Sequence, residues 1–157
     1  MFENGKHIPL QKIESSFLKS NGINLYVKRE DLIHPTIPGN KWRKLKYNFK
    51  EAKKRGHKTI LTFGGAFSNH IAATASAANE YGFSSIGVIR GDELTPSSNP
   101  TLQRAHELGM QLYFVSRQDY KNRNESDFLS ELESKFGDFY AIPEGGSNSL
   151  AVKGCAE

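Results

Sequence analysis

The stretch Lys58-Thr59-Ile60-Leu61-Thr62-Phe63-Gly64-Gly65-Ala66-Phe67-Ser68-Asn69-His70 decides the fold class of this 157-residue chain. Its first six residues form a β-branched and apolar run that is typical of a buried strand, and Gly64-Gly65 ends that run. Ser68 or Asn69 can then cap a helix that extends to about Tyr81. The stretch therefore predicts a strand, a glycine-rich loop and a helix in succession.

The same alternation of strand and helix continues toward the C-terminus. Short apolar runs predict further strands over 85–89, 111–115 and 139–142, and apolar residues at helical spacing predict helices over 100–109 and 125–136. Strands that alternate with helices of about ten to fifteen residues form parallel sheets with right-handed crossovers. We therefore expect an α/β fold, with an open twisted parallel sheet and helices on both faces.

A helix with a basic face precedes this alternating unit. Pro38-Gly39 marks a loop, Asn40 is a favoured N-cap, and the helix is expected to run to about Arg55. Its apolar residues recur at three- and four-residue spacing and form one stripe, namely Trp42, Leu45, Phe49 and Ala52. Upstream, residues 23–28 alternate apolar and polar and predict a half-buried strand. Residues 1–22 carry no strong pattern beyond a candidate short helix around 15–20 and a turn at 21–22.

Lys41 is the first candidate for chemistry, because it falls in the first turn of this helix near the edge of the apolar stripe. At roughly 100° per residue, Lys44 and Lys50 should instead point to water. Burial and the positive end of the helix dipole both disfavour an ammonium ion at Lys41. A neutral amine is the form that attacks a carbonyl group. The alternative interpretation is that Lys41 is one more solvated lysine in a basic helix.

The composition indicates a globular protein, with 37% hydrophobic and 24% charged residues. No apolar run approaches the roughly 20 residues that cross a bilayer, and the N-terminus lacks the pattern of a secretory signal. The one cysteine, Cys155, cannot form an internal disulfide and suits a reducing compartment. We therefore expect a cytoplasmic location and no membrane partner.

Positive charge is concentrated in one segment. The net charge is only +4, yet nine Lys or Arg residues and a single Glu lie between positions 41 and 58. Such a cluster can bind nucleic acid, although on an amphipathic helix it is more often a solvated face. A non-catalytic basic α/β module that binds nucleic acid or an anionic partner is therefore the alternative to an enzyme.

Two glycine-rich loops, 64–69 and 144–148, follow predicted strands and should lie at the same edge of the sheet, where α/β proteins bind ligands. Backbone amides after Gly64-Gly65 can hold an anion, and Ser68 and Asn69 add short polar side chains. His70 would lie just inside the helix, able to titrate near neutral pH. Helix capping and an exposed histidine are the alternatives. The sequence contains no nucleotide-binding glycine motif and no metal-ligand spacing.

Five motifs together resemble one enzyme family, the 1-aminocyclopropane-1-carboxylate deaminases and D-cysteine desulfhydrases. They are Lys-Arg-Glu-Asp-Leu at 28–32, Gly-Asn-Lys-x-Arg-Lys-Leu at 39–45, Gly-Gly-x-x-Ser-Asn-His at 64–70, Ile-Arg-Gly at 89–91 and Pro-Glu-Gly-Gly-Ser-Asn at 143–148. The resemblance covers nearly the whole chain. It implies a pyridoxal-phosphate enzyme of the tryptophan-synthase-β type, which is fold type II.

The resemblance also implies roles for individual residues. Lys41 would hold pyridoxal 5′-phosphate as a Schiff base, and Asn40 and Asn69 would contact the cofactor, Asn69 at the ring oxygen. Ser68, Asn69 and His70 would face a small amino-acid substrate, with Ser68 binding it or handling a proton. His70 stands where the desulfhydrases carry His and the deaminases tend to carry Gln, which favours a desulfhydrase or a related D-amino-acid enzyme.

The resemblance implies a division into domains as well. Residues 1–47 would begin the large cofactor domain, residues 48–150 would form the small α/β domain, and residues 151–157 would begin the return to the large domain. In this family the phosphate-binding loop and the residue facing the pyridine nitrogen come from the C-terminal half, and nothing here matches either. We therefore expect an N-terminal fragment, inactive alone, of an enzyme that is a homodimer when complete and binds no nucleic acid.

Overall fold

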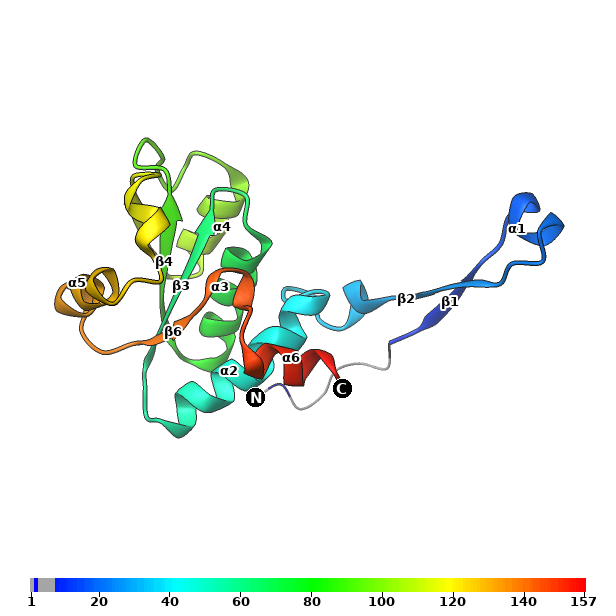
Figure 1. Cartoon of the computed structure of the whole chain (residues 1–157), viewed down its shortest axis with the longest axis horizontal. Coiled ribbons are helices and arrows are strands. Elements are labelled where there is room, and N and C mark those ends of the chain that lie inside the picture. Colours follow the sequence, from blue (N-terminus) through cyan, green and yellow to red (C-terminus); the bar gives the residue numbers. More distant parts are fainter. Residues whose placement is uncertain (1, 3–7) are drawn as a thin grey trace.

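The computed structural model describes residue 2 and residues 8–157, and its centre is a four-stranded parallel sheet (Figure 1). The strand order is β5-β4-β3-β6. The strands are β3 (Thr59–Gly65), β4 (Ser84–Arg90), β5 (Met110–Val115) and β6 (Tyr140–Ile142). The central strand β3 pairs with both β4 and β6, so the two glycine-rich loops leave the same edge of the sheet.

Helices cover both faces of this sheet, as the sequence predicts. Successive residues of a strand point to opposite faces. Ile60 accordingly packs with helices α2 (Asn40–Lys54) and α3 (Asn69–Tyr81), while its neighbour Leu61 packs with α5 (Ser126–Phe136) on the other side. Helix α4 (Pro100–Glu107) lies beside α3. The predicted fold class is confirmed.

The apolar stripe of α2 forms the main anchor of that helix. Trp42, Leu45, Phe49 and Ala52 are all buried, and Phe49 is 0% exposed. The ring of Phe49 lies 5.3 Å from that of Phe83 and 6.3 Å from that of Tyr81, both in edge-to-face contact. This aromatic packing fixes α2 against α3, and so fixes where the side chains at the start of both helices point.

The start of α2 differs by one residue from the prediction. Gly39 is the N-cap and Asn40 is the first helical residue, with no side-chain capping bond. Gly39 has φ 62° and ψ −146°, a backbone conformation that L-residues with a side chain rarely adopt, and its amide donates to the carbonyl of Glu30 at 2.9 Å. The glycine therefore takes the turn position, and Asn40 stays exposed at the helix start.

The strand predicted at 23–28 exists but is not half-buried. Strand β2 (Leu25–Lys28) pairs with β1 (Leu10–Ile13), which the sequence did not indicate, in an antiparallel ribbon that carries the short helix α1 (Ser16–Ser20) at its tip. The ribbon projects from the body of the molecule (Figure 1). Its apolar side chains are therefore exposed, with Leu25 at 45% and Val27 at 40%.

Helix α6 (Ser149–Cys155) packs across α2 and completes the described chain. The crossing is close because Gly154 has no side chain: a Cβ atom there would lie 2.1 Å from the carbonyl oxygen of Arg43. Among the described residues, no helix is long and apolar enough to span a bilayer.

Candidate active site

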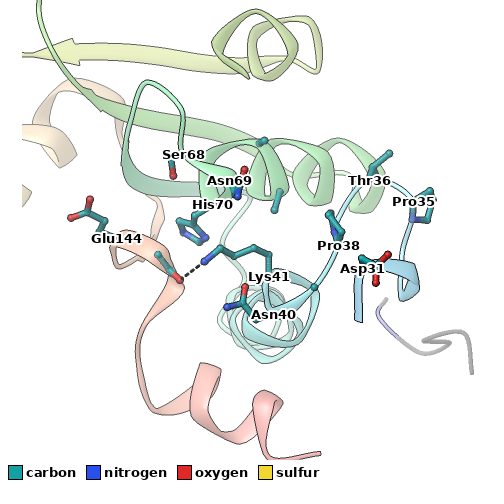
Figure 2. Close-up of a pocket in the computed structure, with 14 residues that line it drawn as sticks. Asp31, Pro35, Thr36, Pro38, Asn40, Lys41, Ser68, Asn69, His70 and Glu144 are labelled. Atoms are coloured by element: carbon teal, nitrogen blue, oxygen red, sulfur yellow. Dashed lines mark hydrogen bonds between the residues drawn. The ribbon is translucent and has the colours of Figure 1, made fainter. Parts of the chain in front are cut away.

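The predicted site residues gather around one open cavity of about 790 Å³ at the carboxyl edge of the sheet. The starts of α2 and α3 and the loop after β6 form its walls. Figure 2 shows Lys41 and His70 pointing toward one another across it, with Ser68 and Asn69 beyond His70. The cavity lining includes all five predicted residues, namely Asn40, Lys41, Ser68, Asn69 and His70. Their roles in binding and catalysis remain predictions.

Lys41 lies in the first turn of α2 and is half-buried at the cavity wall. Its Nζ atom donates one hydrogen bond, to the carbonyl oxygen of Gly145 at 3.4 Å. Burial is the main cause that lowers the pKa of Lys41, and the charge of Lys44 lowers it further. The amine therefore loses its proton more easily than an ordinary lysine does.

Lys44 contradicts the expectation that it points to water. It is half-buried, and its Nζ atom donates to the carbonyl oxygen of Gly145 and to Oγ of Ser147, both at 3.2 Å. The loop after β6 turns back over α2 and meets this side chain, a long-range contact that helical spacing alone does not reveal. Lys50, by contrast, is exposed as predicted.

Ser68 and Asn69 occupy the turn between β3 and α3. Ser68 is the N-cap of α3, and its Oγ atom accepts a hydrogen bond from the amide of Ile71 at 3.3 Å. The turn is tight because a Cβ atom at Gly64 would lie 2.5 Å from Ile71 and 2.8 Å from Oγ of Ser68. Asn69 is exposed at the cavity and makes no side-chain bond within the described chain, so its amide is available to a ligand.

His70 is neither exposed nor able to titrate near neutral pH, which corrects both expectations from the sequence. It is 2% exposed, and burial, followed by the charges of Lys41 and Lys44, lowers its pKa to about 3. Helix α3 turns this side chain inward, under the loop after β6. The imidazole is therefore neutral at physiological pH.

The hydrogen bonds of His70 define its tautomer. Oγ1 of Thr62 donates its single proton to the carbonyl oxygen of Ile142 at 2.8 Å, so toward His70 it can only accept. Nε2 of His70, 2.8 Å away, must then carry the ring proton. Nδ1 is left with a lone pair and, among the described residues, has no partner. His70 thus holds a neutral, buried acceptor atom at the cavity wall.

This protonation state predicts how stability depends on pH. In the unfolded chain His70 binds a proton below about pH 6.5, whereas in the folded chain it binds one only below about pH 3. Stability must therefore fall as the pH falls, by about 1.4 kcal/mol per pH unit from this residue, or about 2 kcal/mol between pH 7 and pH 5. Urea unfolding at the two pH values measures this difference.

Two histidine variants make the test specific. In His70→Gln the side chain cannot titrate, so this part of the pH dependence should disappear. In His106→Gln, which changes an exposed histidine, it should remain. An identical pH dependence in His70→Gln and the unmodified chain would contradict the neutral buried imidazole.

A pair of side-chain amides, one buried and one half-buried, fixes the loop that carries Gly145. Asn48 and Asn148 exchange two side-chain hydrogen bonds, at 3.2 Å and 2.7 Å, and Asn148 also caps α6 by accepting from the amide of Ala151. Asn48 is 0% exposed. The sequence carried a signal for this contact, because Asn48 is a polar residue on the apolar face of α2.

The motif at 28–32 reaches the site through an ion pair. Nε and Nη2 of Arg43 donate to the two carboxylate oxygens of Glu30 at 2.8 Å and 3.0 Å. This fork holds the pKa of Glu30 below its ordinary value. Because the Glu30 carbonyl also accepts from Gly39, the motif fixes the loop that leads into α2 and Lys41.

A family model described as "Pyridoxal-phosphate dependent enzyme" matches residues 3–157. The chain belongs to this family. The family depends on pyridoxal phosphate, so the cofactor implied by the sequence is confirmed. The resemblance to deaminases and desulfhydrases is confirmed by the relatives that follow.

Individual relatives show which enzymes of the family the chain resembles. A Thermotoga maritima protein described as a candidate 1-aminocyclopropane-1-carboxylate deaminase is 41% identical over 85% of this chain and 43% of its own length. The bifunctional D-cysteine desulfhydrase/1-aminocyclopropane-1-carboxylate deaminase of Arabidopsis thaliana mitochondria is 32% identical over 87% of this chain and 36% of its own length. A D-cysteine desulfhydrase of Yersinia pestis is 29% identical, over 96% and 46%. This pyridoxal-phosphate family member thus spans less than half the length of these relatives.

Solved structures agree on the fold. An ACC deaminase homologue superposes with a TM-score of 0.78 at 26% identity, over 95% of this chain and 45% of the other. A hydrogen sulfide-producing enzyme of Fusobacterium nucleatum, 17% identical over 89% of this chain and 43% of its own, has a TM-score of 0.63 and shows the fold alone. The chain has the fold of the type II pyridoxal-phosphate enzymes.

The cavity fits the cofactor that the family requires. Its volume lies in the range of small-molecule sites, roughly 300–1,000 Å³. One wall carries a half-buried amine with a lowered pKa, and the other carries the exposed amide of Asn69. Within the described residues, no group of His, Cys, Asp and Glu could hold a metal ion.

Proposed function

We propose that this chain supplies the catalytic lysine and the substrate-facing loop of a pyridoxal-phosphate lyase or deaminase that acts on a small amino acid. D-cysteine desulfhydrase and 1-aminocyclopropane-1-carboxylate deaminase are the reaction types that the relatives suggest. The observation that supports this most directly is Lys41, whose half-buried amine with a lowered pKa lies in a cavity lined by Ser68, Asn69 and His70.

Each residue has a chemical part in this proposal. Lys41 would bind the cofactor covalently through its free amine, since an ammonium ion has no lone pair to attack an aldehyde. Asn69 would donate its side-chain amide to the cofactor ring oxygen, and Asn40 would lie beside it. When bound, pyridoxal phosphate acts as an electron sink for the bond broken at the substrate α-carbon.

His70 would act as a hydrogen-bond acceptor and not as an acid. A ring with a pKa of about 3 cannot supply a proton near pH 7. Its Nδ1 lone pair, although buried among the described residues, is the acceptor that we propose for an N–H or O–H of the substrate. Ser68, whose hydroxyl group lies in the cavity lining, would then move the proton through Oγ. The presence of His at position 70 favours the desulfhydrase type over the deaminase type.

Ser68→Ala separates a chemical role from a structural one. Loss of the cap would cost about 0.5–2 kcal/mol of stability and leave the rate per folded molecule nearly unchanged. Loss of a positioned proton carrier typically costs about 10²- to 10⁴-fold in rate, so we expect turnover to fall at least about tenfold while cofactor attachment is retained. Near-normal turnover with a lowered melting temperature would reduce Ser68 to a helix cap.

The activity itself is tested on a protein that contains this chain together with the part of its relatives that this chain does not match. Release of sulfide and pyruvate from D-cysteine, or of 2-oxobutyrate from 1-aminocyclopropane-1-carboxylate, would support the two reaction types respectively. Failure of both substrates, with cofactor bound, would contradict the substrate assignment.

The proposal extends to organisation, partners and location. The division at residues 47/48 and 150/151 remains part of it, although α2 runs through the first boundary. The ribbon of β1 and β2 exposes apolar side chains, as expected of a surface that other residues of a large domain would cover. A homodimer of the complete protein is proposed from the family resemblance. A cytoplasmic location is proposed from the free cysteine, Cys155.

The alternative, a basic module that binds nucleic acid, has less support. Several cations of the 41–58 segment are neutralised within the chain: Arg43 pairs with Glu30, Lys46 with Glu157 and Arg55 with Glu51. We therefore propose that nucleic acid is not a partner. Salt-sensitive binding to nucleic acid, in a protein without a cofactor absorption band, would favour the alternative.

A further inference from the structure

Two lysine side chains of α2 contact the same backbone oxygen. Nζ of Lys41 lies 3.4 Å from the carbonyl oxygen of Gly145, and Nζ of Lys44 lies 3.2 Å from it. A carbonyl oxygen has two lone pairs, so both amines can bind at once. They then lie within about two hydrogen-bond lengths of each other, where two ammonium ions repel.

The contacts of the two amines are unequal. Lys44 has a second acceptor, Oγ of Ser147 at 3.2 Å, whereas within the described part of the chain the amine of Lys41 has only the longer contact to Gly145. An ammonium ion with two good acceptors is better compensated for its lost hydration than one with a single long contact. The geometry therefore favours Lys41 as the amine of the pair that loses its proton first.

The remaining charged groups near Lys41 do not reverse this preference. The carboxylate of Glu144 is paired with Nε of Arg123 at 2.9 Å, and that of Asp31 with Arg29 at 2.7 Å. His70 of α3 is neutral, as its buried position requires. Cys155 on α6 raises the pKa of Lys41, but its effect is smaller than the lowering by burial and by the charge of Lys44.

We propose that Lys44 is a positioning residue for Lys41: its ammonium group binds Gly145 and Ser147, fixes the 144–148 loop over α2, and favours the free amine of its neighbour. A lysine placed next to another cation is a known way to obtain a nucleophilic amine. The proposal deepens the proposed function, on which it rests, because the free amine is the form that binds the cofactor.

Competitive acetylation measures the charge state of each lysine without any cofactor. The protein is treated with trace acetic anhydride over the alkaline pH range, and the acetylation of the Lys41 peptide is followed by mass spectrometry. In Lys44→Met and in Lys44→Gln, we expect the pKa of Lys41 to rise by about 0.5 to 1 unit, which means about three- to tenfold less free amine at a given lower pH.

Three variants separate charge from loop contacts. Lys44→Gln keeps a hydrogen-bond donor but no charge, so it should behave like Lys44→Met. Lys44→Arg keeps the charge and should restore the Lys41 pKa of the unmodified chain. Lys50→Met, which removes an exposed charge from the same helix, should leave it unchanged. Circular dichroism establishes that each variant is folded, and Lys44→Gln remains informative if Lys44→Met unfolds.

Two outcomes would overturn the inference. An unchanged Lys41 pKa in Lys44→Gln would show that the charge of Lys44 has no influence on it. A failure of Lys44→Arg to restore the value would show that the effect of the other variants comes from disturbed packing. Either outcome is independent of the proposed function, which is tested separately by cofactor attachment in Lys41→Ala and by turnover of the two substrates.

Discussion

Replacing Lys41 by alanine is expected to abolish covalent attachment of pyridoxal phosphate while leaving the fold intact. Lys41 combines a half-buried amine, a lowered pKa and a place in the cavity wall. Among the described residues, its side chain makes a single hydrogen bond, the long contact to Gly145, so little packing is lost with it. The measurement is the visible absorption band of the bound cofactor, before and after borohydride, in a protein that includes the half found in its relatives.

The control for this experiment is Lys50→Ala, which removes an exposed lysine from the same helix and should keep the full band. Far-ultraviolet circular dichroism should be the same in both variants. A band that survives in Lys41→Ala and is abolished by borohydride would place the attachment at another lysine. Lys44 would then be the next candidate, since it borders the same loop.

Phe49→Ala is expected to have the largest effect on stability. The side chain is 0% exposed and sits between Phe83 and Tyr81, holding α2 on α3. Truncating a buried phenylalanine to alanine typically costs about 3–5 kcal/mol, because apolar contact is lost and a cavity remains. For a chain of this size that corresponds to a fall in melting temperature of roughly 6–20 °C.

The adjacent variant Lys50→Ala provides a matched control, since an exposed substitution on the same helix usually changes stability by less than about 0.5 kcal/mol. Thermal unfolding followed by circular dichroism compares the two. A fall of less than about 1 kcal/mol in Phe49→Ala would mean that α2 is held mainly by its other contacts, such as its crossing with α6.

The sheet and its helices could be predicted because the strands are short apolar runs and the helices repeat apolar residues every three or four positions. Residues 59–65 form a buried strand whose neighbours Ile60 and Leu61 face opposite helical layers, and Ser68 caps the next helix as expected. In parallel sheets, loops that follow strands meet at one edge. The juxtaposition of Lys41, Ser68 and the loop at 144–148 follows from that rule together with the family motifs.

The errors arose where a distant segment decides the environment of a residue. Lys44 was expected in water because helical spacing places it off the apolar stripe, but the loop after β6 covers it. His70 was expected to titrate, but Thr62 and the same loop enclose it. The strand at 23–28 was expected to be half-buried because its residues alternate, but alternation does not show what covers a strand, and β2 pairs with β1 in an exposed ribbon.

Peptide mapping shows directly whether Lys41 is the residue that binds the cofactor. The complete protein is incubated with pyridoxal phosphate, reduced with borohydride and digested, and the modified lysine is located by tandem mass spectrometry. We expect one pyridoxyl group per chain, on Lys41. A modification on Lys44 or on any other lysine, with Lys41 free, would contradict it.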